Sequence, residues 1–425
     1  MSLAEMASMA PTAGGQYHWA SEFAPPSAQR FISYCTGWLS TIAWQSVIAT
    51  DCYIIAGIIQ ALIHVNHDTY EPARWVTTLI TIAVVIALAA FNMFAASHLS
   101  VAEGIFATFH VFAFVPVVIS LWVMAPTTAT YDVFFNFKDH GGGWPSTELA
   151  ALVGQVSCMF VVIGSDSVAH LSEEVEDAAA IVPQAMIWSD VLNAPLAFTM
   201  LITYCFSIGD IGKALASPYP FVYVFQNAFQ SPGATSGFTV VILILLVMIT
   251  ISAIASTARQ AFAFARDNGL PFSSWIKQVN KRYKVPVNAI LLTAAFTIML
   301  SLLNIVSTVA INIALSLSTV ALMATCIFSI SCVTLKRVRK EPLPPARWSL
   351  GKYGLAVNMM ALLYSLWSFF WSMWPSQYHI TAATFNWSPV LFVCLMFFAC
   401  VLYFADTKRR YEGPAVRVQT WMNNG

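Results

Sequence analysis

The sequence is poor in charged residues. Only 9% of its 425 residues are Asp, Glu, Lys or Arg, against roughly 25% in an ordinary soluble domain. Basic and acidic residues number 20 each, so the formal net charge is zero. A chain without a basic or acidic excess gives no indication of binding nucleic acid or an acidic partner. Because 58% of the residues are hydrophobic, we predict a protein of the lipid bilayer.

Paired cysteine motifs are absent as well. The eight cysteines fall within apolar segments or at their edges, and none forms a C-x-x-C pair. The sequence therefore predicts neither a disulfide framework nor a zinc site. No combination of nucleophile and base stands out either, so we expect no enzyme and no cofactor. An intramembrane enzyme that uses His170 with Glu173 or Glu174 is the alternative.

The first ten residues, MSLAEMASMA, do not resemble a signal peptide, because they have no basic start and Pro11 ends the helical run. Two interpretations stay open. The segment is the tail of a membrane-spanning helix, or it is a short interfacial helix.

Long apolar runs predict ten membrane-spanning helices, since a span needs about 20 predominantly apolar residues. The runs are residues 37–62, 75–97, 101–125, 149–171, 186–208, 236–262, 287–305, 307–333, 353–374 and 388–405. No strand is needed to account for any of them. The predicted fold class is an all-α integral membrane protein.

The basic residues predict the orientation. With both termini in the cytoplasm, 17 of the 20 Lys and Arg residues face the cytoplasm, and only Arg74, Lys138 and Lys213 lie on the other side. This partition follows the positive-inside rule. We expect the plasma membrane, with a vacuolar or other internal membrane as the alternative.

One apolar run is interrupted by a glycine and an acid. Gly164 is followed by Ser165, Asp166 and Ser167. Broken backbone at membrane depth is tolerated only where it lines a cavity or is buried in protein, and an acid there costs about 2.5–3.5 kcal/mol. The pattern predicts a site for a substrate, cation or proton. The alternative is that the span ends at Ile163 and that Asp166 lies among lipid headgroups.

Other ionisable residues accompany this break. A helix that resumes at Val168 would place His170, Glu173 and Glu174 on the same face as Asp166. A proton relay is one interpretation, and a polar helix end in the cytoplasm is the other. A metal site is not predicted, because no second histidine stands at helical spacing.

Three more ionisable residues interrupt apolar runs. Asp51, His110 and Asp190 are functional candidates for that reason. The alternatives are an interfacial position for Asp190 and a hydrogen bond to a neighbouring carbonyl for His110.

Five segments together resemble one family of transporters. They are SLAEMASMAPTAGGQYHW (2–19), GSDSVAHLSEEVEDAAAIVPQAM (164–186), STARQAFAFARDNGLPFS (256–273), VPVNA (285–289) and RRYEGP (409–414). In order and spacing they resemble the amino acid, polyamine and organocation (APC) superfamily, specifically its fungal-type amino acid, choline and GABA permease branch. The resemblance covers essentially the whole chain and does not specify the substrate.

This resemblance implies a LeuT-like fold, in which two inverted five-helix repeats each open with a broken helix and two further spans follow. It implies that residues 2–10 correspond to the end of the second helix, so that the first helix and most of the second are missing. The fold would then be N-terminally incomplete. We therefore expect this chain by itself to transport poorly or not at all, and a transport-inactive membrane fragment is the alternative function.

The resemblance also divides the chain into regions. Residues 1–36 are the remnant of the second helix and a cytoplasmic loop, 37–335 the transporter core, 336–352 a basic cytoplasmic loop, 353–405 the last two spans and 406–425 a cytoplasmic tail.

The same resemblance implies roles for individual residues. Gly164, Ser165, Asp166 and Ser167 would be the unwound, substrate-facing part of the sixth helix, and Phe160 an aromatic gate. The other expected cavity residues are Trp44, Gln45 and Asp51, and the expected coupling residues are Asp166, His110, Ser252 and Ser256. The implied function is a proton-driven secondary active transporter for amino acids or related amines such as GABA or choline.

Overall fold

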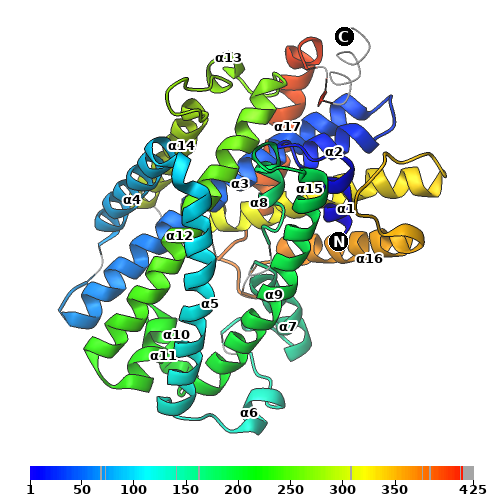
Figure 1. Ribbon diagram of the computed structural model, residues 1–425. Helices are drawn as coiled ribbons and strands as arrows, with labels where there is room; N and C mark the ends of the chain where they lie inside the picture. Colours follow the sequence, from blue (N-terminus) through cyan, green and yellow to red (C-terminus); the bar gives the residue numbers. More distant parts are fainter. Residues whose placement is uncertain are drawn as a thin grey trace.

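The computed structural model describes residues 1–414 apart from residues 68, 72, 140, 161–162, 307–308, 376, 382–383 and 412. All regular secondary structure in this part of the chain is helical (Figure 1). Nine helices within it are long and apolar enough to cross a membrane. The prediction of an all-α membrane protein is thereby confirmed.

The nine long helices are α3 (Gln29–Asn66), α4 (Arg74–Phe94), α5 (Leu99–Met124), α9 (Ala178–Ser207), α12 (Pro232–Arg266), α14 (Val287–Val306), α15 (Val309–Val338), α16 (Gly354–Ser372) and α17 (Ser388–Ala405). The shorter helices are α1 (Ser2–Met9), α2 (Gln16–Phe23), α6 (Thr130–Phe134), α7 (Thr147–Phe160), α8 (Ser167–His170), α10 (Ile211–Ala216), α11 (Pro220–Phe229) and α13 (Ser273–Ile276). Four 3₁₀ turns complete the set: η1 (Ala96–His98), η2 (Ser172–Glu174), η3 (Gly351–Tyr353) and η4 (Thr407–Arg409).

The tenth predicted span, residues 149–171, is not one continuous helix. It consists of α7 and the four-residue α8, with the Gly164 segment between them. Several other helices extend beyond their apolar runs. The longest, α3, has 38 residues, which at about 1.5 Å per residue makes it about 57 Å long. Because the hydrocarbon core is roughly 30 Å thick, its ends project beyond the bilayer.

Helix α9 begins at Ala178, eight residues before the expected start at 186. Pro183 lies inside it and has no N–H to donate to the carbonyl of Ala179. The hydroxyl of Ser8 donates to that carbonyl instead, at 2.7 Å. A distant side chain thus replaces the lost helical hydrogen bond, which the local sequence could not predict.

Four long helices form the centre of the molecule. Helices α3 and α4 pack against each other and against α12 and α14. Their contact is apolar and includes Ile48 and Ile55 of α3, Val85 of α4, Ile254 of α12 and Ile290 of α14, all nearly fully buried. Helix α15 packs along α3 and α16, while α1 and α2 lie at one end of this bundle (Figure 1). This arrangement leaves the α7–α8 break facing α2 and α3.

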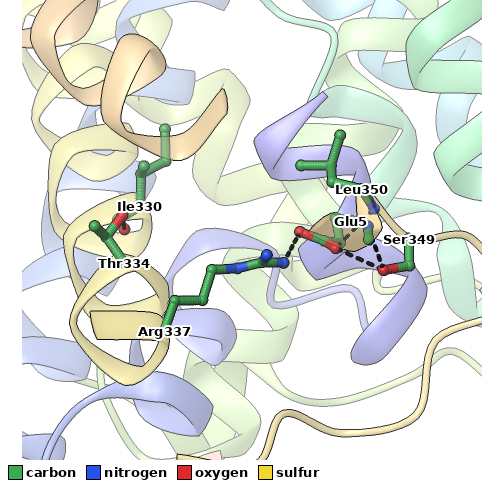
Figure 2. A network of polar contacts seen from close by, with 7 residues as sticks. Glu5, Ile330, Thr334, Arg337, Ser349 and Leu350 are labelled. Atoms are coloured by element: carbon green, nitrogen blue, oxygen red, sulfur yellow. Dashed lines mark hydrogen bonds and ion pairs between the residues drawn. The ribbon is translucent and has the colours of Figure 1, made fainter. Parts of the chain in front are cut away.

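A buried acid connects α1 to the C-terminal part of the chain. The Glu5 carboxylate is paired with the Arg337 guanidinium and accepts hydrogen bonds from Ser349 Oγ at 3.0 Å and Leu350 N at 2.9 Å (Figure 2). Only 2% of Glu5 is exposed. Because α15 continues to Val338, Arg337 lies on its last turn, where a cation also interacts favourably with the helix dipole. The loop expected to begin at 336 therefore starts after Val338.

Candidate functional site

The predicted interruption at Gly164 is present. Its φ is +111°, a conformation that glycine adopts readily and residues with a Cβ rarely do. Ser167 N then donates to the Gly164 carbonyl at 2.9 Å, and α8 begins. Ser165 and Ser167 are half-buried on either side of Asp166. Phe160 is the last residue of α7, and its side chain lies outside the part of the chain that is described.

Asp166 is enclosed by protein. Only 5% of the residue is exposed. Its Oδ2 accepts a hydrogen bond from Gln16 Nε2 at 2.5 Å and lies 3.8 Å from His170 Nε2. The Asp166 carboxylate therefore lies between α2, which carries Gln16, and the short helix α8, which carries His170.

His170 is completely buried and held on two sides. Its Nδ1 is 2.8 Å from the Ala13 carbonyl, and its ring meets the Trp44 ring edge to face, with centroids 5.6 Å apart. Because a carbonyl can only accept, Nδ1 carries the proton. In a neutral imidazole the other nitrogen, Nε2, then has a bare lone pair beside the Asp166 carboxylate. The 3.8 Å between Nε2 and Oδ2 is longer than a hydrogen bond, and Nε2 has no hydrogen-bond partner among the described residues.

Trp44 brings α3 to the break. It is 3% exposed, and its ring lies 3.9 Å from the position that a Cβ on Gly164 would occupy. Its indole Nε1 is buried without a hydrogen-bond partner among the described residues. Trp44 thus contacts His170 and approaches Gly164, on the same short segment that carries the Asp166 carboxylate. Such a set suits a small solute that carries both an ammonium and an acceptor group.

The structure does not bring all the predicted residues to this place. Gln45, next to Trp44, points toward α14 and donates to Thr293 Oγ1 at 3.1 Å. Asp51 is buried on α3, two turns or about 10 Å along the helix from Trp44. Ser256 is buried on α12, and Ser252, one turn earlier, is half-buried. His110 has its side chain exposed on α5.

Ion pairs lie beside the break on the side of α12. Glu173 is paired with Arg266 at 2.8 Å, and Glu174 with Arg259 at 2.7 Å. Tyr17 of α2 donates to Asp267 at 3.0 Å. These contacts tie η2 and α2 to the end of α12. The sequence predicted one helical face that carries Asp166, His170, Glu173 and Glu174, but α8 ends at His170 and the two glutamates lie in η2, turned toward α12. Neither Gln16 nor the arginine partners was predicted, because a single sequence does not show which distant residues meet.

The charges around the ion pairs shift two pKa values. Burial and the nearby Arg266 charge lower the pKa of His18 to about 4, against the opposing effect of Glu173. Burial alone would raise the pKa of Glu173, but the hydrogen bond and charge of Arg266 outweigh it and lower that pKa. At neutral pH, His18 is therefore uncharged and Glu173 is ionised.

Gly15 allows α2 to approach His170, and we expect Gly15→Ala to destabilise the protein. Its backbone has φ +55° and ψ −128°, and an added Cβ would lie 2.8 Å from His170 Cε1. Backbone strain and overpacking together predict a loss of about 2–4 kcal/mol. Thermal unfolding of the purified protein in detergent measures it. The control is Gly237→Ala in α12, where a Cβ meets nothing within 4 Å. Equal melting temperatures for the two variants would contradict the prediction.

Comparison with known proteins identifies the family of the chain. A family model described as amino acid permease matches residues 1–398. An uncharacterized amino-acid permease of Schizosaccharomyces pombe is 26% identical over 98% of this chain and 78% of its own length. The amino-acid permease BAT1 of Arabidopsis thaliana is 28% identical over 97% of this chain and 83% of its own. The thiamine transporter thi9 of S. pombe is 26% identical over 98% of this chain and 76% of its own.

Proposed function

Because the chain belongs to the amino acid permease family of the APC superfamily, we propose that it is a proton-coupled secondary active transporter for amino acids or related amines such as GABA or choline. It is a multi-pass membrane transporter and not an enzyme. The observation that carries the finer proposal is the buried Asp166 carboxylate at the helix break, in contact with Gln16 and His170.

The substrate amine binds between Asp166 and Trp44. A buried carboxylate favours a positive charge close to it, and the face of an indole attracts an ammonium, including a quaternary one. The backbone around Gly164 supplies N–H and C=O groups that are not used by a helix. Phe160, four residues before Gly164 in the sequence, remains the candidate for an aromatic gate. The name of the relative thi9 shows that this set of similar proteins includes a transporter of a compound other than an amino acid.

The coupling proton binds at the Asp166–His170 pair. Because Nδ1 of His170 is committed to the Ala13 carbonyl, the proposed position of this proton is between Nε2 and the Asp166 carboxylate, which are 3.8 Å apart. Proton and substrate then use the same carboxylate, which couples their binding. Ser252 and Ser256 of α12 and His110 of α5 are the remaining coupling candidates, and Asp51 and Gln45 the remaining cavity candidates.

The transport cycle requires the site to open on alternate sides by rocking of one group of helices against the other. The pairs Glu173–Arg266 and Glu174–Arg259 join the break to α12 and close one side. The distribution of basic residues supports a cytoplasmic location for this side and for both termini. We propose the plasma membrane as the location.

Uptake into liposomes tests the proposal. Residues 1–425 are reconstituted in one sample, and in a second they are fused to the part of the Arabidopsis permease that this chain does not match, which we call the extended chain. Labelled amino acids, GABA, choline and thiamine are offered with and without an inward proton gradient. We expect gradient-dependent accumulation of one amine, removed by a proton ionophore. No accumulation of any amine by either folded sample would contradict the transport proposal, and accumulation that ignores the gradient would contradict the coupling.

A further inference from the structure

An apolar cavity of about 320 Å³ lies away from the helix break. One wall is a face of α3, where residues 38, 41, 42 and 45 are spaced as neighbours on a helix. The other walls are α14 and the segment from Leu270 through α13. Among the lining side chains, Thr41 and Gln45 donate to Gly37 O and Thr293 Oγ1, whereas the indole Nε1 of Trp38 has no hydrogen-bond partner among the described residues. The volume lies within the usual range of roughly 300–1,000 Å³ for ligand pockets.

Large aromatic side chains stand at the mouth of this cavity. Phe272 is 84% exposed and Trp275 is 44% exposed, and both line the cavity. Phe272 has a φ of +57°, which is uncommon for a bulky residue. The Ser273 hydroxyl holds the turn, because it accepts from Leu270 N and donates to Leu270 O. The exposure of Phe272 is thus built into the backbone, and aromatic residues with one wet and one apolar side are typical of membrane interfaces.

A basic loop joins the two walls. Residues 277–286 connect α13 to α14 and contain Lys277, Lys281, Arg282 and Lys284, all exposed. The stretch from 268 to 286 contains no acidic residue. None of the four cations forms an ion pair within the described part of the chain, although Lys277 donates to the neutral Asn268 amide. A positive rim therefore borders an apolar cavity.

We propose that this cavity binds one acyl chain of an anionic phospholipid whose phosphate contacts the basic loop. The apolar walls replace the contacts that the chain makes in the bilayer, and the four cations attract a negative headgroup in the cytoplasmic leaflet. This site is distinct from the helix break, because Trp44 and Asp166 do not line it, although Gln45, a remaining candidate for the substrate cavity, does. A sterol is the competing occupant, since Gln45 Oε1 has no donor among the described residues, but an uncharged sterol leaves the basic rim unused.

Native mass spectrometry of the purified full chain in detergent tests the site. The probes are phosphatidylserine and phosphatidylcholine with identical acyl chains, and ergosterol. We expect one phosphatidylserine retained per chain, with at least about tenfold preference over phosphatidylcholine. Changing Lys277, Lys281, Arg282 and Lys284 together to Gln should remove the preference. The matched control changes Lys408, Arg409 and Arg410 to Gln in the exposed C-terminal cluster, and it should leave the preference unchanged.

A second variant tests the cavity itself. Leu292→Trp fills the cavity from α14, whereas Leu303→Trp adds the same ring on an exposed part of α14. Only Leu292→Trp should lower phosphatidylserine retention, by about tenfold or more, because each CH₂ of the acyl chain that is displaced loses about 0.8 kcal/mol. Melting temperatures verify that each variant is folded. If Leu292→Trp does not fold, the test rests on the variant with Lys277, Lys281, Arg282 and Lys284 changed to Gln. Equal retention of the two phospholipids, retention of ergosterol in their place, or unchanged retention in the charge variant overturns the proposal.

Discussion

Asp166→Asn should abolish proton-driven amine accumulation in the extended chain. The substitution preserves the size of the side chain and leaves an oxygen that can accept from Gln16 Nε2. It removes the negative charge beside His170, so the pair can no longer take up a proton under the same electrostatic attraction. Loss of a charged partner is also expected to weaken binding of an ammonium by about 10- to 100-fold. Accumulation should fall to the level of protein-free liposomes.

Two measurements separate the possible roles of Asp166. Exchange of labelled for unlabelled substrate does not need a net proton flux, so a variant that lacks only the coupling proton continues to exchange. A variant that lacks the ammonium partner loses exchange and also the thermal stabilisation by substrate. The matched control is Asp190→Asn, the same change at an exposed position of α9, which should keep most activity. Normal accumulation by Asp166→Asn would refute both roles.

Glu5→Ala should destabilise the fold more than any surface substitution. Glu5 is 2% exposed and its partner side chain on Arg337 is 12% exposed, so the substitution leaves a largely buried guanidinium without a counter-charge. The Leu350 amide and the Ser349 hydroxyl lose their acceptor as well (Figure 2). Breaking a buried pair by removing one partner costs about 3–5 kcal/mol. A lower melting temperature and a smaller folded yield in detergent would measure the loss.

The chain contains a suitable control for this experiment. Arg339 and Glu341 form an exposed pair at 3.8 Å, with about half of each side chain accessible. Glu341→Ala should therefore cost at most about 1 kcal/mol. Replacing Glu5 and Arg337 together by Met should recover part of the stability, because no buried charge is then left alone. If Glu5→Ala has the same melting temperature as the wild type, the network does not hold α1 in place.

The membrane class and the helix break could be predicted because both depend on local sequence. The apolar runs are long enough, as helices, to cross the hydrocarbon core of the bilayer. A glycine and an aspartate within such a run are energetically unfavourable in an apolar helix, so Gly164 and Asp166 predict the break. The helix ends were less predictable. The start of α9 depends on Ser8, which supplies the hydrogen bond that Pro183 removes, and the end of α15 depends on Glu5, which pairs with Arg337. Both partners are far away along the chain.

The sequence alone determined that this protein is helical and membrane-embedded, and that Asp166 lies at a broken helix. Hydrophobicity and backbone preference act over a few residues, so they can be predicted from the sequence alone. Only the tertiary structure decided that Asp166 meets Gln16 and His170, and that Trp44 faces the break while Gln45 faces α14. Successive residues of a helix point about 100° apart, so which of two neighbours reaches the site depends on how α3 packs. That packing is set by apolar contacts with α4, α12 and α14, which no segment contains by itself.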